Sequence, residues 1–263
     1  MGKYLYKYMP FNMNALNILI NENLHLGSPA GLNDPFEGEF IFNHSDEIPN
    51  EEYSINTSEK IIIDKKKLSN EEFITELKKA YRKNLQQQYG VSCFSERNDS
   101  ILMWAHYADL HKGICLIFEK EKLINSVQKN YHEIKLDKVK YNRDFIPIDI
   151  KVTPRGLDFL RIEETYLNKL NHWKYEKEVR LHWYVPENFT HRNIGFDCNS
   201  IVGIILGHKI DSQSEILLTN IIASPKLKHL KWYKALPDLK LKKMKIEKFG
   251  GFFIPRSLSF QRN

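Results

Sequence analysis

The chain has 263 residues, of which 42% are hydrophobic and 12% aromatic, and its formal net charge is +6 with a pI near 9.0. This length allows one large domain or two small ones, and the apolar content is sufficient for a hydrophobic core. The N-terminus has no continuous apolar segment, and no later run approaches the roughly 20 residues of a membrane span. We therefore expect a cytoplasmic protein without a membrane segment.

The cysteines give no sign of a metal centre. Cys93, Cys115 and Cys198 are odd in number and far apart, and neither they nor the histidines show metal-ligand spacing. Cys93 and Cys115 stand in apolar, strand-like runs, which is typical of core packing. We predict no metal site.

The N-terminal residues predict a strand followed by a helix. Residues 4–8 alternate and are rich in tyrosine, which indicates a short strand that Pro10 ends. Asn12 or Asn14 can cap a helix that continues to about Asn21.

A strong turn signal and a polar segment follow. Asn33, Asp34 and Pro35 form the turn, because Asx side chains bond nearby backbone groups and proline fixes φ. Residues 43–70 are polar and predict an insertion or mobile loop with one short element near residues 60–63.

Ser69 and Glu72 have the spacing of a capping box, which predicts a helix over residues 70–88. A strand over residues 91–95 then carries Ser92 and Ser95 on opposite faces.

The next elements are a helix from about residue 100 to 109 and a continuous apolar strand over residues 114–118, typical of a buried position. The remaining expected elements are helices over 120–128, 157–170 and 212–223 and strands over 134–141, 201–208, 230–235 and 239–245. No internal repeat or interdomain linker separates them. We expect a single α+β domain over residues 1–263, with a central mixed, mostly antiparallel sheet and flanking helices.

The segment from His172 to His182 contains two glutamates and an arginine at alternate positions. Its aromatic and β-branched residues favour a strand, in which Glu176, Glu178 and Arg180 share one face with His182. In a helix, Glu176 and Arg180 would instead form an ordinary i,i+4 pair. Such a strand presents either a solvated face with surface ion pairs or a functional site.

The chain lacks the motifs of P-loop, Rossmann, zincin and α/β-hydrolase proteins. What remains is a set of carboxylates, serines, tyrosines and one arginine in aromatic surroundings. This set suits a small phosphorylated ligand that carries an aromatic ring. Tyrosine and tryptophan would stack on the ring, serine and asparagine would bind an amide or ribose, and Arg180 would pair with phosphate.

Several blocks stand out along the chain: the N-terminal tyrosine-rich strand, N33-D-P-F-E37, S92-C-F-S95, the helix segment Asp99–Asp109 with its M-W-A-H-Y core, G113-I-C-L, and W173-K-Y-E-K-E-V-R180. Together these blocks resemble the bacterial family of unknown function called DUF2971. The family name implies no reaction.

The block order also resembles that of ADP-ribosyltransferase-like domains, which implies NAD as the substrate. In that superfamily a first motif contacts ribose or nicotinamide, a serine strand frames the nicotinamide pocket, and a glutamate bonds the nicotinamide ribose. The resemblance makes Glu178 the expected catalytic residue and Glu176 the second choice. With the aromatic and polar residues of the other blocks, the candidate nucleotide-binding residues are Tyr6, Lys7, Tyr8, Asn33, Asp34, Ser92, Ser95, Trp104, His106, Tyr107 and Arg180. This chain has Lys7 between tyrosines where superfamily members commonly have His or Arg.

Two alternatives remain open. A nucleic-acid-binding protein or metal-dependent nuclease would use the basic C-terminal strands and an acidic cluster of Asp34, Glu37, Glu176 and Glu178. A non-catalytic module in a bacterial stress or phage-defence setting would bind a nucleotide signal without turnover.

Overall fold

The computed structural model describes residues 2–43, 49–55, 61–153, 156–159, 162–184 and 192–249. The chain divides into two compact units between which it alternates. Unit 1 comprises Met1–Glu22, Arg97–Leu123 and Asp197–Asn263, and unit 2 comprises Asn23–Glu96 and Ile124–Phe196.

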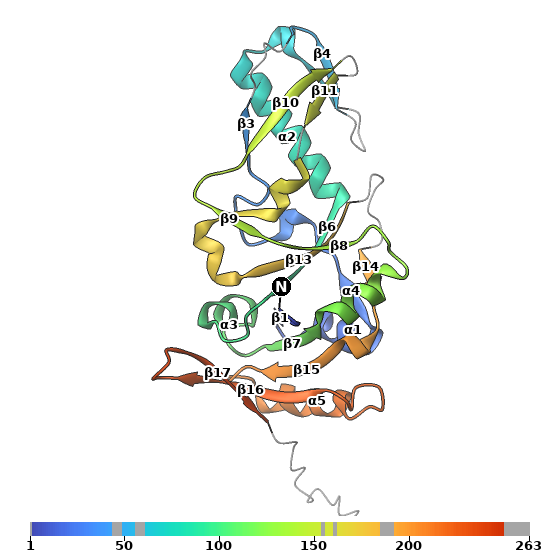
Figure 1. The fold of residues 1–263 in the computed structure, drawn as a ribbon, viewed down its shortest axis with the longest axis vertical. Coiled ribbons are helices and arrows are strands. Elements are labelled where there is room, and N and C mark those ends of the chain that lie inside the picture. The colour runs from blue at the N-terminus through green and yellow to red at the C-terminus, as the bar shows by residue number, and fades with distance from the viewer. Residues whose placement is uncertain are drawn as a thin grey trace, which may run out of the picture. The chain divides into compact units, whose positions relative to one another are not determined.

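Unit 1 is built on a sheet whose strands run in the order β17-β16-β15-β7-β1 (Figure 1). Its strands are β1 (Tyr4–Met9), β7 (Ile114–Glu119), β15 (Ile201–Leu206), β16 (Lys231–Asp238) and β17 (Lys243–Lys248), and its helices are α1 (Met13–Asn21), α3 (Ile101–Tyr107), α5 (Ser212–Ile222) and the short η5 (Cys198–Ser200). All neighbouring pairs are antiparallel except β15 with β16. Helix α4 (Lys120–Gln128) continues from unit 1 into unit 2.

The apolar strand predicted over residues 114–118 is confirmed as β7, at the centre of the unit 1 core. Its residues from Ile114 to Phe118 are buried, and the facing Leu5 and Ile204 are fully buried. The core of unit 1 therefore lies along β7 and its two neighbours, β1 and β15.

Among its described residues, unit 2 contains one longer antiparallel group of strands, in the order β6-β13-β8, and several small pairings. The group consists of β6 (Tyr89–Ser95), β13 (Glu178–Tyr184) and β8 (Lys135–Lys138). The small pairings join β2 (Asn23–His25) to β14 (Asn193–Gly195), β4 (Glu52–Ile55) to β5 (Ile61–Asp64), β9 (Lys140–Asn142) to β12 (Asn168–Leu170), and β10 (Pro147–Thr153) to both β3 (Ile41–Asn43) and β11 (Gly156–Phe159). The helices are α2 (Asn70–Gln88) and the short η1 (Pro29–Gly31), η2 (Lys65–Lys67), η3 (Ile162–Leu167) and η4 (Asn171–Glu176).

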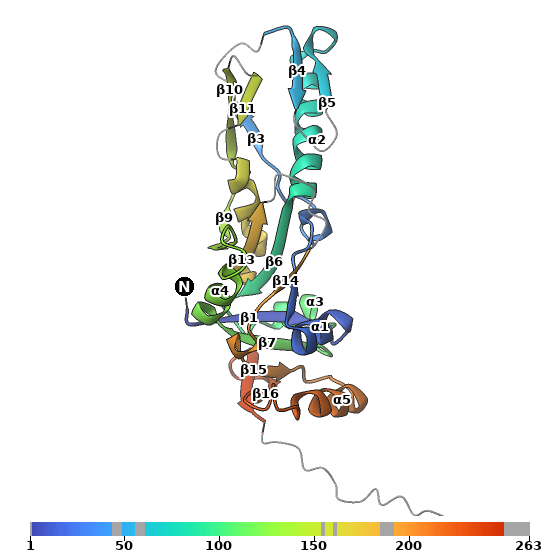
Figure 2. The same cartoon turned by 90° about the vertical axis from the view of Figure 1, so that its right-hand side faces the viewer.

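Helix α2 packs against the small strands of unit 2 (Figure 2). One buried cluster joins Phe73, Leu77 and Ala80 of α2 with Tyr53 of β4 and Ile63 of β5, and Phe40 and Ile148 complete it. Most of these residues come from segments that are otherwise polar, so the helix and the strands bury each other's few apolar side chains.

The expected fold class is confirmed: the structure is a mixed α+β fold with mostly antiparallel pairing. The predicted elements at residues 4–8, 70–88, 91–95, 201–208 and 212–223 are all present, with small shifts at their ends. Among the described helices, none combines the length and the apolar character needed to cross a membrane.

The expected insertion at residues 43–70 is more ordered than its composition indicates. Strands β4 and β5 pair within it, and η2 precedes α2. Residues 44–48 and 56–60 of this segment lie outside the described residues.

The helix predicted over residues 157–170 is wrong. This segment contains β11, η3 and β12 instead. Strand β12 pairs in parallel with β9, so pairing with a strand distant in sequence overrides the helical pattern.

The strand predicted over residues 172–182 is half wrong. Its first part is η4, and Lys177 has a left-handed backbone (φ 47°), so β13 begins only at Glu178.

Candidate functional site

Strand β13 places Glu178, Arg180 and His182 on one face, as the period of two predicts. Val179 and Leu181 are fully buried on the other face. The polar side is buried as well, with Glu178 5% exposed, Arg180 0% and His182 7%. Strands β6 and β8 flank β13 and cover it on both edges. The interpretation of this strand as a solvated face is therefore wrong.

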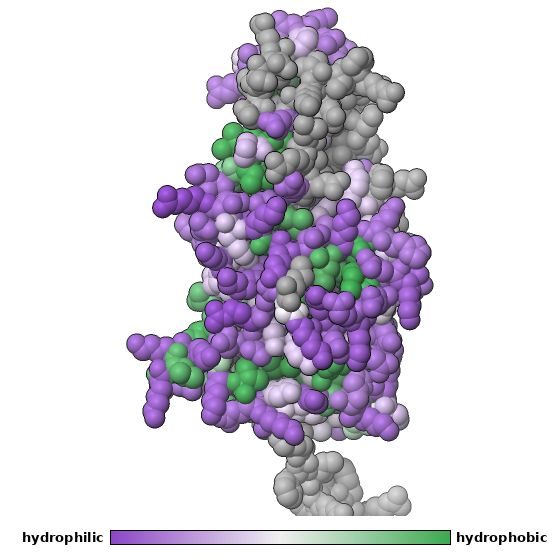
Figure 3. Space-filling model, in the orientation of Figure 1, coloured by the Kyte–Doolittle hydropathy of each residue, from purple (hydrophilic) through white to green (hydrophobic). Residues whose placement is uncertain are grey.

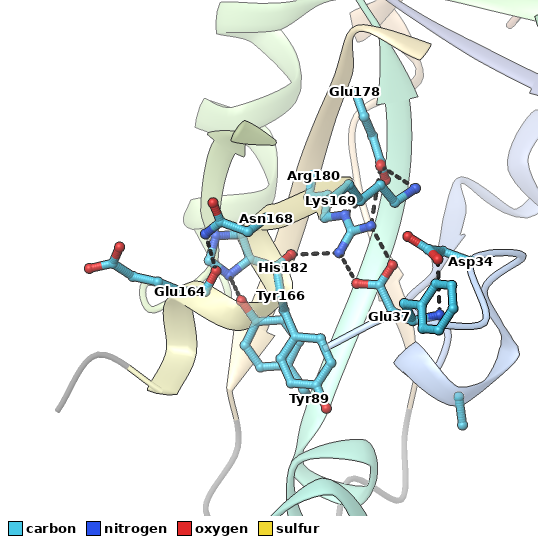
Figure 4. A network of polar contacts seen from close by, with 12 residues as sticks. Asp34, Glu37, Tyr89, Glu164, Tyr166, Asn168, Lys169, Glu178, Arg180 and His182 are labelled. Carbon is cyan, nitrogen blue, oxygen red and sulfur yellow. Dashed lines mark hydrogen bonds and ion pairs between the residues drawn. The ribbon is translucent and has the colours of Figure 1, made fainter. Parts of the chain in front are cut away.

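Arg180 is the centre of a buried network, and all five of its N–H donors are engaged (Figure 4). Its Nε and Nη2 donate to Glu178 at 2.8 and 3.2 Å. Its Nη1 and Nη2 donate to the two carboxylate oxygens of Glu37 at 2.5 and 2.9 Å, and Nη1 also donates to the carbonyl of Tyr166 at 2.5 Å. The expectation that Arg180 pairs with a phosphate is therefore corrected. None of its N–H donors remains available for a ligand.

Glu37 reaches Arg180 because of the predicted turn. The carbonyl of Asp34 accepts from the amide of Glu37, and Gly38 follows with φ 73°. A Cβ at Gly38 would lie 2.6 Å from the ring of Tyr166, so only glycine fits there. The turn thus places Glu37 against the guanidinium and Gly38 against the ring of Tyr166.

Lys169 provides the second cation of the network. Its Nζ lies 2.8 Å from an oxygen of Glu176 and 2.8 Å from an oxygen of Glu178, and it lies over the ring of Trp173. The network therefore holds three carboxylates and two cations. The structure brings Glu176 and Glu178 together as predicted, but through Lys169 and from different elements, not as neighbours on one strand.

The charges of the network stabilise one another. Burial would raise the pKa of Glu178, but the attraction of Arg180 and Lys169 outweighs burial and lowers that pKa well below its ordinary value. Burial would lower the pKa of Lys169, but the attraction of Glu178, aided by Glu176, outweighs it and raises that pKa. Glu178 is consequently ionised throughout the neutral range.

The serine strand lies directly beside the glutamate strand. In the antiparallel register of β6 and β13, Ser95 is opposite Glu178 and Cys93 is opposite Arg180. Ser95 is fully buried and donates its hydroxyl to the carbonyl of Glu176 at 2.5 Å, and Ser92 is 2% exposed. Both predicted serines are therefore buried, and at least Ser95 supports the backbone of the network.

His182 extends the polar face at the other end of β13. Its Nδ1 lies 2.6 Å from the hydroxyl of Tyr89, and its Nε2 lies 3.0 Å from the carboxylate of Asp137. Burial lowers the pKa of His182, and Asp137 opposes this effect in part. The neutral ring fits these contacts if Nε2–H donates to Asp137 and Nδ1 accepts from Tyr89.

The turn residues differ in exposure. Asn33 is exposed, whereas Asp34 is 4% exposed and accepts from the amide of Phe36 at 2.9 Å. The side chains of Asp34, Phe36, Phe145 and Lys169 are among those that line a small surface depression.

The other candidate residues belong to unit 1. Tyr8 donates its hydroxyl to the carbonyl of Arg97, and its ring meets the ring of Trp104 edge-on at 5.2 Å. Trp104 is fully buried and donates its indole N–H to the carbonyl of Asn98. Both aromatic side chains are therefore part of the core. The expectation that they stack on the ring of a ligand is corrected, because Tyr8 and Trp104 are buried.

Tyr6, Lys7 and Tyr107 are half-buried, and His106 is exposed on α3. Burial raises the pKa of the Tyr6 hydroxyl, so the hydroxyl keeps its proton and can donate a hydrogen bond. These four residues stay predicted binding residues.

No sequence signal marks Lys169, and Glu37 is predicted only as a member of the acidic cluster. In the structure Glu37, Glu176 and Glu178 pair with Arg180 and Lys169, whereas Asp34 accepts from the amide of Phe36. Within the described ranges, no group of three or more His, Cys, Asp or Glu residues could hold a metal ion.

The described fold and network define a mixed α+β protein with a buried ionic core in unit 2. A family model described as "Protein of unknown function (DUF2971)" matches residues 103–181, which include Glu176, Glu178 and Arg180. This match supports the resemblance to DUF2971. Neither a curated protein nor a solved structure matches the chain.

Proposed function

We propose that the protein is an NAD-consuming enzyme, an ADP-ribosyltransferase or NAD glycohydrolase, in a bacterial defence or toxin-type setting. The observation that carries the proposal is the pairing of β6 with β13, which sets Ser95 opposite Glu178. A serine strand beside a glutamate strand is the arrangement that the resemblance to ADP-ribosyltransferase-like domains implies.

In the proposed reaction the bond between C1′ of the ribose and the nicotinamide nitrogen breaks, and nicotinamide leaves with the bonding electrons. The positive charge that develops on the ribose is stabilised by an ionised carboxylate nearby. Water or an acceptor group then adds to C1′ and loses its proton. Glu178 suits this role because Arg180 and Lys169 keep it ionised.

A ribose hydroxyl would reach Glu178 most easily at Cys93. The carboxylate of Glu178 accepts from Arg180, Lys169 and the thiol of Cys93. Arg180 and Lys169 are buried, whereas Cys93 is partly exposed. A thiol is also the weakest donor of the three, so a hydroxyl would replace it at the lowest cost.

The test is release of free nicotinamide from NAD by the purified chain, with Glu178→Gln in parallel. We expect turnover by the parent and a loss of about 10²–10³-fold in the variant, because the charge that stabilises the transition state is gone. Glu37→Gln is the matched control, since it removes the other carboxylate that Arg180 binds. Its turnover per folded molecule should fall far less.

No nicotinamide release by the parent, together with no thermal stabilisation by NAD, would sink the proposal. Full turnover by Glu178→Gln would remove Glu178 from the mechanism.

A further inference from the structure

The hairpin of β16 and β17 ends in a tip, Leu239–Lys242, that the proposed function does not use. Leu239 is 90% exposed and Leu241 is 61% exposed. Figure 3 shows hydrophobic residues surrounded by hydrophilic ones at this end of the hairpin. A single exposed leucine is ordinary on a protein surface, but two on one tight turn form a small apolar patch.

The tip has a fixed conformation. One carboxylate oxygen of Asp238 accepts from the amides of Lys240 and Leu241, each at 2.9 Å. Lys242 closes the turn with a left-handed backbone (φ 51°). The two leucine side chains are thus held outward on an ordered turn. The chain therefore loses little conformational entropy when a partner binds them.

Positive charge surrounds the leucines. The exposed lysines of the tip and of β17 are Lys240, Lys242, Lys243, Lys245 and Lys248. Lys243 pairs with Asp99 at 3.3 Å and Lys245 with Glu247 at 2.8 Å. Lys240 and Lys242, the two lysines that alternate with the leucines, have no acidic partner in the part of the chain that the structure describes.

We propose that this tip binds the surface of an anionic phospholipid bilayer. Leu239 and Leu241 enter the boundary between headgroups and acyl chains, while Lys240 and Lys242 contact the lipid phosphates. The basic C-terminal strands first suggested a nucleic acid, which the lysines would fit. The leucines favour the membrane, because single-stranded nucleic acids are bound mainly by aromatic stacking and most contacts to duplexes come from polar and charged side chains.

The experiment is co-sedimentation of the full chain with phosphatidylcholine vesicles, with and without phosphatidylglycerol, at physiological salt. We expect binding only to the anionic vesicles. Leu239→Ser with Leu241→Ser should weaken this binding at least about tenfold while every charge is kept. Lys240→Gln with Lys242→Gln should weaken it to a similar extent and reduce its salt dependence.

The matched control is Ile216→Ser with Leu217→Ser, which removes two apolar side chains of α5 that are 60% and 49% exposed. This control should bind vesicles like the parent. The proposal is overturned if the parent does not bind anionic vesicles, or if the leucine variant binds them as well as the parent. Loss of binding in the α5 control, or binding to a DNA duplex in place of vesicles, would also overturn it.

Discussion

Arg180 shows how one side chain can determine a site without being available to a ligand. It is 0% exposed, and its five donors go to Glu178, Glu37 and the carbonyl of Tyr166. The alternation of Glu178 and Arg180 on one face could be read from the sequence. The pairing with Glu37 could not, because 143 positions separate the two residues and only the fold brings them together.

The buried network predicts that two similar substitutions lower the free energy of unfolding by very different amounts. Glu37→Gln should lower the free energy of unfolding by about 3–5 kcal/mol, because it leaves the buried guanidinium short of a charged partner. Glu39→Gln should cost no more than about 1 kcal/mol, because its partners Arg82 and Lys78 are partly exposed. Urea unfolding of both variants measures the difference. Equal losses would mean that burial does not set the strength of the network.

At the level of elements, local signals succeeded where the local chain makes the contacts. The capping box predicted α2, and Ser69 and Glu72 do bond reciprocally: the amide of Ser69 donates to Glu72, and the amide of Glu72 donates to the Ser69 hydroxyl. The predictions for residues 157–170 and 172–177 failed because a distant strand, β9, and a left-handed residue, Lys177, determine the structure there. Neither leaves a local pattern.

Helix α2 allows a direct test of its cap. Ser69→Ala should destabilise unit 2 by about 0.5–2 kcal/mol, because the amide of Glu72 loses its acceptor. Thr75→Ala, one turn later on the exposed face, should cause no loss, since its hydroxyl only donates to the carbonyl of Glu71 and alanine is the better helix former. Urea unfolding compares the two. A loss from Thr75→Ala as large as that from Ser69→Ala would contradict the capping role.

At the scale of the whole molecule, the sequence could predict the fold class but not the division of the chain. No composition change marks the crossing points, and each unit is assembled from separate segments. The candidate residues divide accordingly. Tyr6, Lys7, Tyr8, Trp104, His106 and Tyr107 belong to unit 1, while the ionic network belongs to unit 2. Interleaved segments of this kind carry no sequence signal, because each one has the pattern of an ordinary strand or helix.

The stability of the whole chain should fall as the pH is lowered from neutrality. Burial lowers the pKa values of His111 and His208 in unit 1 and of His182 in unit 2 below their ordinary value of 6.5. The unfolded chain therefore binds more protons than the folded one once the pH drops through 6.5, and stability is lost from there downward. A second loss of stability should follow below pH 4.5, because the pKa of Glu178 is lower in the folded chain than in the unfolded one.

Two variants isolate the part of this pH dependence that belongs to His182. His182→Gln keeps a donor and an acceptor but does not titrate, so unfolding midpoints measured between about pH 7.5 and 5.5 should fall less steeply than in the parent. Asp137→Asn should make the fall steeper, because Asp137 is the group that opposes the lowering of the histidine pKa. Because His111 and His208 still titrate, the slope of His182→Gln should be reduced but not abolished. Parallel curves for the parent and both variants would show that His182 does not link folding to pH.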